Sequence, residues 1–395
     1  MRKYKLSEVG KIVSGATPKT SEPKYYGGEI PWLTPADLSG YDRKYISHGS
    51  RNITQMGYDS CSTQIMPAGT VLFSSRAPIG YVAIAQNPIC TNQGFKSIVP
   101  NENVNSEFLY YQLKYLRSQI QDMGSGTTFK EISAKRLGEV QVVLPGLDEQ
   151  ARIVTRIEEL FSELDNAVET LEKAKRQLAV YRQAVLINAF SEIPDVVDMG
   201  TLADMVDPQP SHRTPPEVAD GIPYIGIGDI DYEHNKINFS DSRKVAIAVL
   251  SEHNVRYTVR NGDFIMGKIG TIGKPFQLPL PQNYALSANV ILIQPKQQLI
   301  IPEFLFWQFA SPLVVKQLIS GATATSQPAF GIKKARKIKI RVCNIAKQEK
   351  LLSDINMKIS MCDGIEKSID AALQQALMMR HSILKQAFTE VSYDS

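Results

Sequence analysis

Hydrophobic positions along the chain follow a short period in some stretches and a longer one in others. Short apolar runs bounded by Gly and Pro, such as TVLFSS, GYVAIA, DFIMG and NVILIQP, predict β-strands. Amphipathic runs at 106–120 and 302–319 predict short helices. Alternating stretches at 140–145 and 337–342 predict one more strand at the end of each strand-rich segment.

A long heptad stripe follows each strand-rich segment. Between residues 150 and 192 the apolar positions step by four and three in alternation, with no Pro or Gly. This pattern predicts a coiled-coil helix, and about 41 residues at about 1.5 Å each would make a rod of roughly 60 Å. The stripe at 348–392 is less regular, because Lys358 lies on it and Gly364 lies within it. The residues predicted to form the helix–helix interface are Ile153, Ile157, Leu160, Leu164, Leu171, Leu178, Leu351, Ile355, Ile365, Ile369 and Ile383.

The two halves of the chain are copies of one another. IPWLTPADL at 30–38 returns as IPYIGIGDI at 222–230, and SEFLYYQL at 106–113 returns as PEFLFWQF at 302–309. AFSE and AFTE close the two halves. Many further matches keep the same order, which is the mark of an internal duplication. We therefore predict a strand-rich domain at 1–149, a long helix at 150–192, a second strand-rich domain at 193–347 and a second long helix at 348–392.

These patterns predict an α+β fold in which two strand-rich domains are each followed by a long helix. A pseudo-two-fold axis would pair the two helices as an antiparallel coiled coil. The alternative is that each helix packs only onto the domain that precedes it.

Charge is unevenly distributed over the two copies. The whole chain has a net charge of +4, but residues 1–149 carry +3 and residues 199–347 carry +6. The helical segments 150–198 and 348–395 carry −3 and −2. Two basic domains, separated and followed by acidic helical segments, indicate a polyanionic partner for the domains.

The sequence contains no pattern that predicts catalysis. The glycine-rich stretch GKIGTIGK (267–274) lacks the Gly-Lys-Ser/Thr end of a phosphate-binding loop. The repeated Asp37 and Asp229 follow strands, where Asp typically caps a turn. The four cysteines have no metal-ligand spacing, and no dinucleotide fingerprint or methyltransferase motif is present. We therefore predict no catalytic residue and no metal site in this chain.

Two similar basic modules suit double-stranded DNA, whose backbone is itself two-fold related. Loop cations could neutralise phosphates, and short polar side chains could meet base edges or phosphates. For each single residue a solvated loop position is the alternative. The predicted DNA contacts are Lys19, Ser74, Ser75, Arg76, Thr91, Asn92, Gln93, Ser125, Thr127, Thr128, Lys130, Lys268, Thr271, Lys274, Thr323, Lys333 and Lys334.

This layout resembles the specificity subunit of type I restriction–modification enzymes. TTFKEISAKRLGEVQVVLPGLDEQARIVTRIEELFSELD (127–165) resembles the family's junction of recognition domain and conserved helix. IPWLTPADL and VLFSSRAPIGYVAI also resemble family segments. In the second copy, CNIAKQEKLLSDI lacks the Leu-Pro-x-Leu that leads into the Gln.

The resemblance implies a non-catalytic subunit whose two domains read the halves of a bipartite DNA site. It also implies that the helices dock two modification subunits, and that restriction subunits join the complex. S-adenosylmethionine, ATP and Mg²⁺ would be bound by those partners and not by this chain. The N-terminal MRKYKLSEVG lacks the apolar core of a signal peptide, so a cytoplasmic location is expected. The alternatives are a coiled-coil adaptor without DNA specificity and a stand-alone DNA-modifying enzyme.

Overall fold

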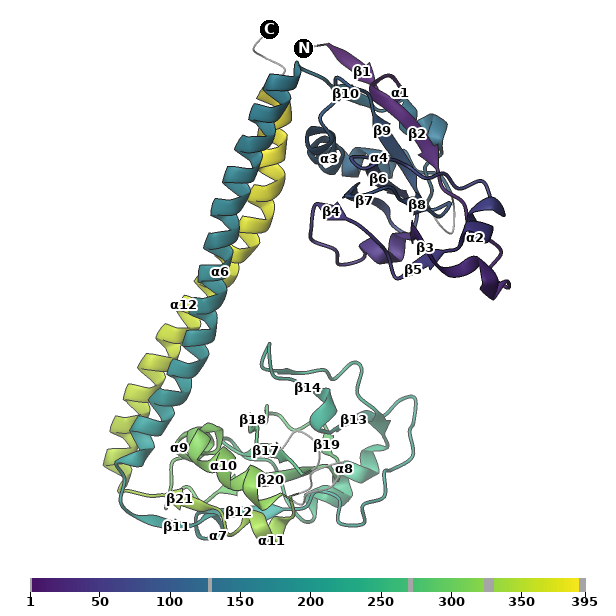
Figure 1. Cartoon of the computed structure of the whole chain (residues 1–395). Helices are drawn as coiled ribbons and strands as arrows, with labels where there is room; N and C mark the ends of the chain where they lie inside the picture. The colour runs from purple at the N-terminus through teal and green to yellow at the C-terminus, as the bar shows by residue number, and fades with distance from the viewer. Residues whose placement is uncertain (1, 127–129, 269–272, 323–329, 391–395) are drawn as a thin grey trace. The chain divides into compact units, whose positions relative to one another are not determined.

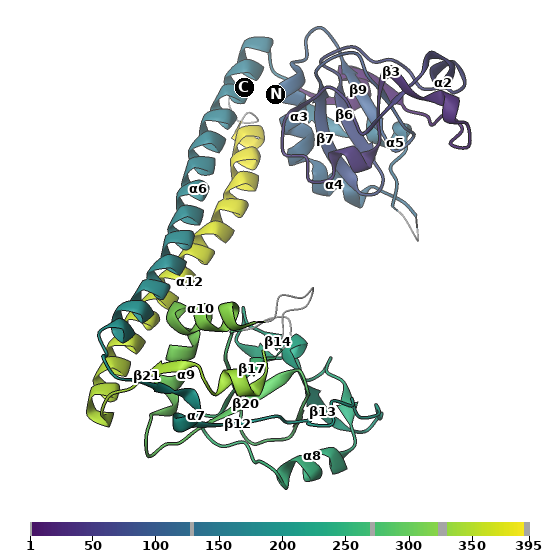
Figure 2. The same ribbon diagram turned by 60° about the horizontal axis from the view of Figure 1, so that its bottom comes forward.

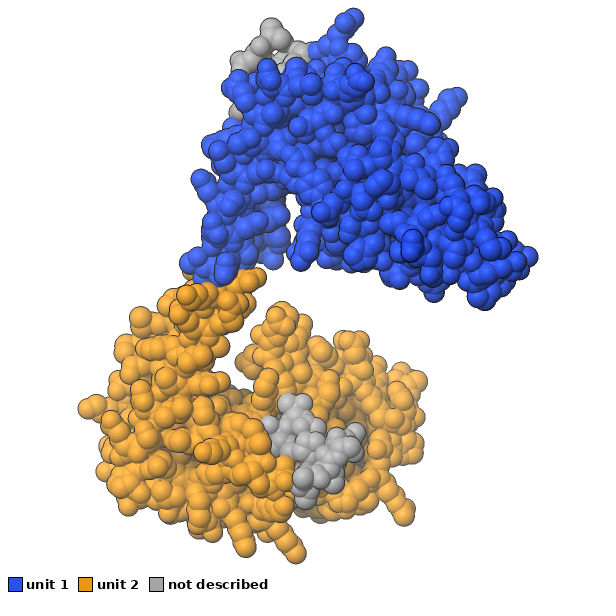
Figure 3. Space-filling model, viewed as in Figure 1, with its two compact units in different colours: residues 1–171, 371–395 blue, residues 172–370 orange. Residues whose placement is uncertain are grey.

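The protein's structure is a computed structural model that describes residues 2–126, 130–268, 273–322 and 330–390. It divides into two compact units (Figure 3). Unit 1 contains residues 1–171 and 371–395, and unit 2 contains residues 172–370. The division cuts both long helices, so each unit holds one strand-rich domain and a part of each long helix.

Unit 1 contains three sheets. A five-stranded sheet has the order β2-β9-β6-β7-β4, a three-stranded sheet has the order β5-β3-β8, and β1 pairs with β10 (Figures 1 and 2). The strands are β1 (Lys3–Lys5), β2 (Gly10–Ser14), β3 (Tyr26–Leu33), β4 (Tyr45–Ile46), β5 (Arg51–Ile53), β6 (Val71–Ser75), β7 (Ile79–Ala85), β8 (Cys90–Thr91), β9 (Lys96–Pro100) and β10 (Gln141–Val143). The helices are α1 (Leu6–Val9), α2 (Gln55–Asp59), α3 (Ser106–Tyr115), α4 (Arg117–Asp122), α5 (Ala134–Gly138) and α6 (Leu147–Ser191), with 3-10 turns at Pro23–Tyr25 and Pro35–Leu38.

Strand β6 shows why the apolar runs of unit 1 are continuous and not alternating. Val71 and Phe73 point into one core with Phe108 of α3, whereas Leu72 points into a second core on the other face. A strand segment that is buried on both faces carries hydrophobic residues at consecutive positions, as Val71, Leu72 and Phe73 do here. The run TVLFSS therefore places β6 at the centre of the domain.

Unit 2 repeats this arrangement. Its sheets have the orders β12-β20-β17-β18 and β16-β13-β19, with β11 paired to β21 and β14 paired to β15. The strands are β11 (Val196–Asp198), β12 (Ala203–Val206), β13 (Ile222–Ile225), β14 (Ile230–Asp231), β15 (Lys236–Ile237), β16 (Lys244–Val245), β17 (Phe264–Gly267), β18 (Phe276–Gln277), β19 (Ala285–Leu286), β20 (Val290–Pro295) and β21 (Lys339–Arg341). The helices are α7 (Met199–Leu202), α8 (Ile247–Asn254), α9 (Pro302–Ala310), α10 (Pro312–Gly321), α11 (Ile332–Ala335) and α12 (Ile345–Glu390), with a 3-10 turn at Ile227–Asp229.

Helices α6 and α12 pair antiparallel within each unit (Figure 1). In unit 1 the start of α6, at Ile153 and Ile157, shares a core with Leu384 and Phe388 near the end of α12. In unit 2 the roles are exchanged, because the end of α6 shares a core with the start of α12. Each domain core thus includes both helices, which contradicts the alternative in which a helix packs only onto the domain before it. The predicted α+β fold with paired long helices is confirmed.

The repeated aspartates stabilise turns. Asp37 Oδ2 accepts hydrogen bonds from the backbone N–H of Thr34 at 2.7 Å and from its hydroxyl at 2.8 Å. Asp37 Oδ1 accepts from the N–H of Ser50 at 2.7 Å, and Asp229 Oδ2 accepts from the N–H of Gly226 at 2.7 Å. Burial alone would raise the pKa of Asp37, but the bonds from Ser50 and Thr34 outweigh it and lower that pKa. The capping role expected for both residues is confirmed.

In the part of the chain that the structure describes, no helix is both long enough and apolar enough to cross a membrane.

Candidate nucleic-acid interface

Three of the predicted contact residues in unit 1 are buried. Ser74 and Ser75 lie on β6 and Thr91 lies on β8, and none of them exposes more than 1% of its surface. The Ser74 hydroxyl donates to the Pro78 carbonyl at 2.7 Å, and that of Ser75 donates to Gly94 at 3.1 Å. The structure therefore does not support contacts between these three residues and DNA, because strand packing covers their side chains.

Arg76 lies just beyond them, where β6 turns into β7, and its side chain is 36% exposed. Its guanidinium is 3.7 Å from a carboxylate oxygen of Glu131, whose other oxygen is 3.8 Å from Lys96 Nζ. Burial, opposed by Glu131 and assisted by Arg76, lowers the pKa of Lys96. Two cations thus share one carboxylate, which leaves a positive charge available to a phosphate.

Lys96 was not among the predicted contacts. Its signal in the sequence was a lysine at the start of a strand, directly before the buried Ser97 and Ile98, where an unpaired charge is costly.

The other predicted residues of unit 1 that the structure describes lie on loops. Lys19, Gln93, Ser125 and Lys130 are exposed, and Asn92 is half-buried with its side-chain oxygen accepting from the Gly94 N–H at 2.8 Å. Thr127 and Thr128 lie outside the described residues.

In unit 2, the predicted contact Lys268 is already paired. Its Nζ donates to Asp207 Oδ2 at 2.8 Å, and both side chains are mostly covered. Lys274 is exposed and lies over the ring of Tyr232, with Nζ 5.4 Å from the centroid. Lys333 and Lys334 are exposed on α11. Thr271 and Thr323 lie outside the described residues.

Backbone hydrogen bonds show that Ser75 and Lys268 occupy the same place in the two copies. The N–H of Ser75 donates to the Gly94 carbonyl at 2.7 Å, and the Ser75 carbonyl accepts from Ile132 at 3.0 Å. The N–H of Lys268 donates to Asn289 at 2.7 Å, and its carbonyl accepts from Phe330 at 2.8 Å. One backbone framework therefore presents different side chains at the same position in the two units.

The start of each long helix is anchored by a buried glutamine. Gln150 accepts from the Asn105 N–H at 2.7 Å and donates to the carbonyls of Asn103 and Pro145 at 2.9 and 2.8 Å. Gln348 accepts from the Ile301 N–H at 2.9 Å and donates to Leu299 and Cys343 at 3.4 and 2.8 Å. Both glutamines are fully buried. These anchors fix where each domain meets its helix.

The predicted coiled-coil residues differ in burial. Lys358 on the predicted stripe is exposed and Ile359 is buried, because an unpaired lysine is costly to bury. The helix therefore turns Ile365 outward, where 49% of its surface is exposed. The predicted interface residues that are buried are Ile153, Ile157, Leu164, Ile355 and Ile369, and those that are half-buried are Leu160, Leu171, Leu178, Leu351 and Ile383.

Each unit has an apolar groove between the two long helices. The groove of unit 1 has a volume of 570 Å³ and includes Leu164, Ala167 and Met379. The groove of unit 2 has a volume of 380 Å³ and includes Cys362, Ile365 and Tyr181, which are the positions equivalent to those three by the 198-residue repeat. Met379 and Tyr181 are 46% and 50% exposed. The repeat therefore places the same groove in both units.

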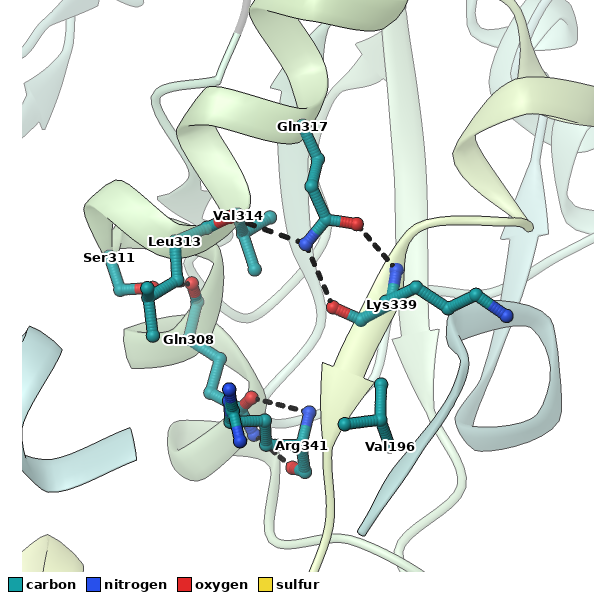
Figure 4. Close-up of a pocket in the computed structure, with 8 residues that line it drawn as sticks. All are labelled: Val196, Gln308, Ser311, Leu313, Val314, Gln317, Lys339 and Arg341. Atoms are coloured by element: carbon teal, nitrogen blue, oxygen red, sulfur yellow. Dashed lines mark hydrogen bonds between the residues drawn. The ribbon is translucent and has the colours of Figure 1, made fainter. Parts of the chain in front are cut away.

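A polar pocket in unit 2 is a structural feature of strand β21 (Figure 4). The Gln308 amide donates to the Arg341 carbonyl at 2.6 Å and accepts from its N–H at 2.9 Å. Gln317 makes the same two bonds with Lys339, at 3.0 and 2.8 Å. The two amides thus act as a neighbouring strand for β21, so their hydrogen-bonding groups are already used. Among the described residues, no group of three or more His, Cys, Asp or Glu side chains could hold a metal ion.

Comparisons with known proteins agree with the sequence resemblance. Residues 1–176 match the family model of the type I restriction modification DNA specificity domain. The chain is 44% identical over 171 residues to the type I restriction enzyme MjaIX specificity subunit of Methanocaldococcus jannaschii, a match that covers 43% of this chain and 39% of that protein. It is 22% identical over 400 residues to the EcoBI specificity subunit of Escherichia coli, covering 94% of this chain and 77% of that protein.

Solved structures share the fold over nearly the whole chain. The HsdS subunit of Thermoanaerobacter tengcongensis has a TM-score of 0.59 at 17% identity, covering 98% of this chain and 96% of that one. A chain from a study of complex assembly and conformational transition of the type I R-M system has a TM-score of 0.73 at 16% identity, covering 98% and 97%.

Proposed function

Because residues 1–176 match the family model of the type I restriction modification DNA specificity domain, we propose that this chain is the DNA-recognition and scaffold subunit of a type I restriction–modification complex. The observation that carries the proposal is the duplication of one backbone framework, marked by the equivalent hydrogen bonds of Ser75 and Lys268, in two basic domains whose loop sequences differ. Two domains with different loops on one chain suit a bipartite DNA target whose two half-sites differ in sequence.

The two equivalent grooves between α6 and α12 support a scaffold role. A repeated apolar surface fits two copies of one partner, and contiguous exposed apolar patches mark protein interaction sites. We propose that each groove docks one modification subunit and that restriction subunits join the complex. In this proposal those partners bind S-adenosylmethionine, ATP and Mg²⁺. This chain itself catalyses no reaction. The complex acts on DNA in the cytoplasm.

The groove proposal is tested by the composition of the assembled complex. We expect Met379→Glu and Tyr181→Glu, at equivalent positions of the two grooves, each to remove one of two modification subunits, measured by native mass spectrometry, because a buried carboxylate is costly. Lys367→Gln, an exposed change on α12, is the control. Two retained subunits in both variants would contradict docking at the grooves.

DNA recognition is tested by mapping the methylated motif of the reconstituted complex. We expect a bipartite motif with a non-specific gap. One heptad inserted into α6 within 167–181, with a matching heptad in α12 within 364–378, should lengthen the gap and leave both half-sites unchanged. An unchanged gap would contradict the spacer role of the helices. Methylation by the purified chain alone would instead favour a stand-alone enzyme, and a complex without salt-sensitive DNA affinity would favour a protein-only adaptor.

A further inference from the structure

Loop 207–213 of unit 2, which follows β12, has its base held by two cationic side chains. Lys268 donates to the Asp207 carboxylate at 2.8 Å, and the Arg256 guanidinium donates to the Pro208 carbonyl at 2.7 Å. Lys268 and Asp207 expose only 16% and 19% of their side chains. The predicted DNA contact Lys268 is therefore better described as an anchor of this loop.

A buried hydrogen-bond chain holds the middle of the loop. His253 Nε2 lies 2.7 Å from Gln209 Oε1, and His253 Nδ1 lies 3.0 Å from the Tyr257 hydroxyl. Because an amide oxygen only accepts, Nε2 carries the hydrogen and Nδ1 accepts from Tyr257. Burial, assisted by the neighbouring Arg256, lowers the pKa of His253 and so favours this neutral form.

Gln209, which is held by His253, also makes hydrogen bonds to residues at the tip of the loop. Its Nε2 donates to the Ser211 hydroxyl at 2.9 Å and to the Arg213 carbonyl at 3.2 Å. The N–H of His212 donates to the Gln209 carbonyl at 3.0 Å, and His212 has a left-handed φ of 52°. Residues other than Gly rarely adopt that backbone conformation unless their surroundings impose it. The tip is thus held in one shape by buried groups.

Arg213, the arginine of this loop, has no carboxylate partner among the described residues. Arg213 is exposed, and within the described ranges neither Arg213 nor Arg256 takes part in an ion pair. His212 Nε2 is 3.9 Å from Asp207, whose charge is already matched by Lys268. The loop therefore presents unneutralised positive charge on a shaped backbone.

Unit 1 has a loop at the same place, held by unrelated residues. Residues 15–20 follow β2, the counterpart of β12. Trp32 Nε1 donates to the Ala16 carbonyl at 3.0 Å, and the Tyr26 hydroxyl donates to Pro18 at 2.8 Å. The exposed Lys19 at the tip takes part in no ion pair among residues that the structure describes. Thus each domain has a loop at this place that is held by hydrogen bonds from different residues. In each loop the structure describes an exposed cationic side chain that takes part in no described ion pair.

We infer that loop 207–213 is a DNA-backbone contact of unit 2, with Arg213 as its phosphate-binding residue and with Gln209 and His253 as positioning residues. The inference rests on the proposed DNA-recognition function. A guanidinium suits this task because its fork of donors matches two phosphate oxygens. The anchors matter because a contact on a pre-shaped loop loses less conformational freedom on binding.

The contact is tested with the full chain and a 40-base-pair mixed-sequence duplex by fluorescence anisotropy over a range of salt concentrations. Each phosphate neutralised contributes about 0.9 to the slope of log affinity against log salt. We expect Arg213→Gln to lower that slope by about one phosphate and to weaken binding several-fold. Lys367→Gln removes the same charge from exposed α12 and should leave both values unchanged.

The positioning role is tested by two substitutions of His253. His253→Leu removes the donor to Gln209, and we expect it to weaken binding about as much as Arg213→Gln. The amide of His253→Gln can still donate to Gln209, so this variant should keep wild-type affinity. In the double variant Arg213→Gln/His253→Leu the two losses should not add, because both remove the same contact.

Different results overturn different statements. If the wild-type chain and its complexes show no salt-sensitive affinity for DNA, the proposed function and this inference both fail. If the wild type binds and Arg213→Gln binds with the same slope, only the loop contact is overturned. If His253→Leu weakens the Arg213→Gln variant as much as it weakens the wild type, the positioning role is overturned.

Discussion

Arg182 on α6 donates to Asp363 on α12 at a distance of 2.7 Å. The same pair occurs again with the helices exchanged, as Arg380 on α12, 198 residues after Arg182, with Asp165 on α6, 198 residues before Asp363. Each unit holds one of the two pairs. Because the residues exchange helices between the units, the pair recurs only if the helices are antiparallel and in a matching register. The repeated ion pair is thus a direct trace of the duplication in the helix–helix interface.

We predict that Arg182→Gln lowers the free energy of unfolding by about 1 kcal/mol, because its side chain is 29% exposed and also pairs with Glu366. Urea denaturation at low and high salt measures the effect, which should shrink at high salt. Arg176→Gln, at a more exposed position on the same helix, should change stability by less than about 0.5 kcal/mol. Equal losses in the two variants would contradict a role for the interhelical pair.

The substitution Gln150→Leu should lower the free energy of unfolding strongly, although it changes the size of the side chain little. It leaves the Asn105 N–H and the carbonyls of Asn103 and Pro145 buried without their partner, at a cost of about 2–4 kcal/mol. Urea denaturation measures the loss, and Gln374→Leu on the exposed face of α12 is the control. Gln348→Leu should behave in the same way, since Gln348 makes the equivalent bonds. A stability loss below that of the control would argue against the anchor.

Phe388→Ala should destabilise unit 1 by about 3–5 kcal/mol. Phe388 is 3% exposed and packs edge-on against Phe108, with ring centroids 5.4 Å apart. Thermal unfolding followed by circular dichroism measures the effect. Phe239→Ala removes a ring that is 37% exposed and should cost much less. If both changes lowered the melting temperature equally, the end of α12 would not be part of the unit 1 core.

The stability that Asp37 contributes should depend on pH. Its pKa in the folded protein lies below the ordinary value of 3.8, so the contribution is complete above that value. It is lost as the pH falls from 3.8 through the folded pKa. We therefore expect Asp37→Asn to be less stable than wild type near pH 6 and to approach it near pH 2. Thermal unfolding over that range checks this, with the exposed Asp42→Asn as control; a constant difference would contradict the assignment.

Arg76→Ala should weaken the binding of mixed-sequence duplex DNA several-fold without changing the melting temperature by more than about 2 °C. Its guanidinium is partly exposed and shares Glu131 with Lys96, so a positive charge remains after pairing. Glu131→Gln should have the opposite effect on affinity, because it frees both cations. Anisotropy titrations measure both variants. Unchanged affinity in Arg76→Ala would remove this residue from the interface.

Much of the architecture followed from the sequence because it depends on repetition and period. The order of the duplicated segments, the strands at apolar runs such as that of β6, and both long helices are local patterns that survive folding. The capping role of Asp37 was also predictable, since a short carboxylate after a strand can reach the backbone of the next turn. These features need only neighbouring residues to be decided.

The candidate interface was less predictable, because accessibility depends on packing between distant segments. Ser74, Ser75 and Thr91 have the chemistry to meet DNA, yet adjoining strands cover them. Lys268 is turned away by Asp207, which lies 61 residues earlier in the chain. No spacing in the sequence signals that pairing.

The sequence by itself determined that this protein is built twice from one plan, because ordered matches and heptad period are properties of the chain alone. Only the tertiary structure decided which side of α12 faces α6, since burying Ile359 and exposing Lys358 is settled by the cost of an unpaired charge in the interface. Likewise, only folding brings His253 to Gln209 across 44 residues and so shapes the loop that carries Arg213. Contacts of this kind depend on distance in space, which the order of residues does not record.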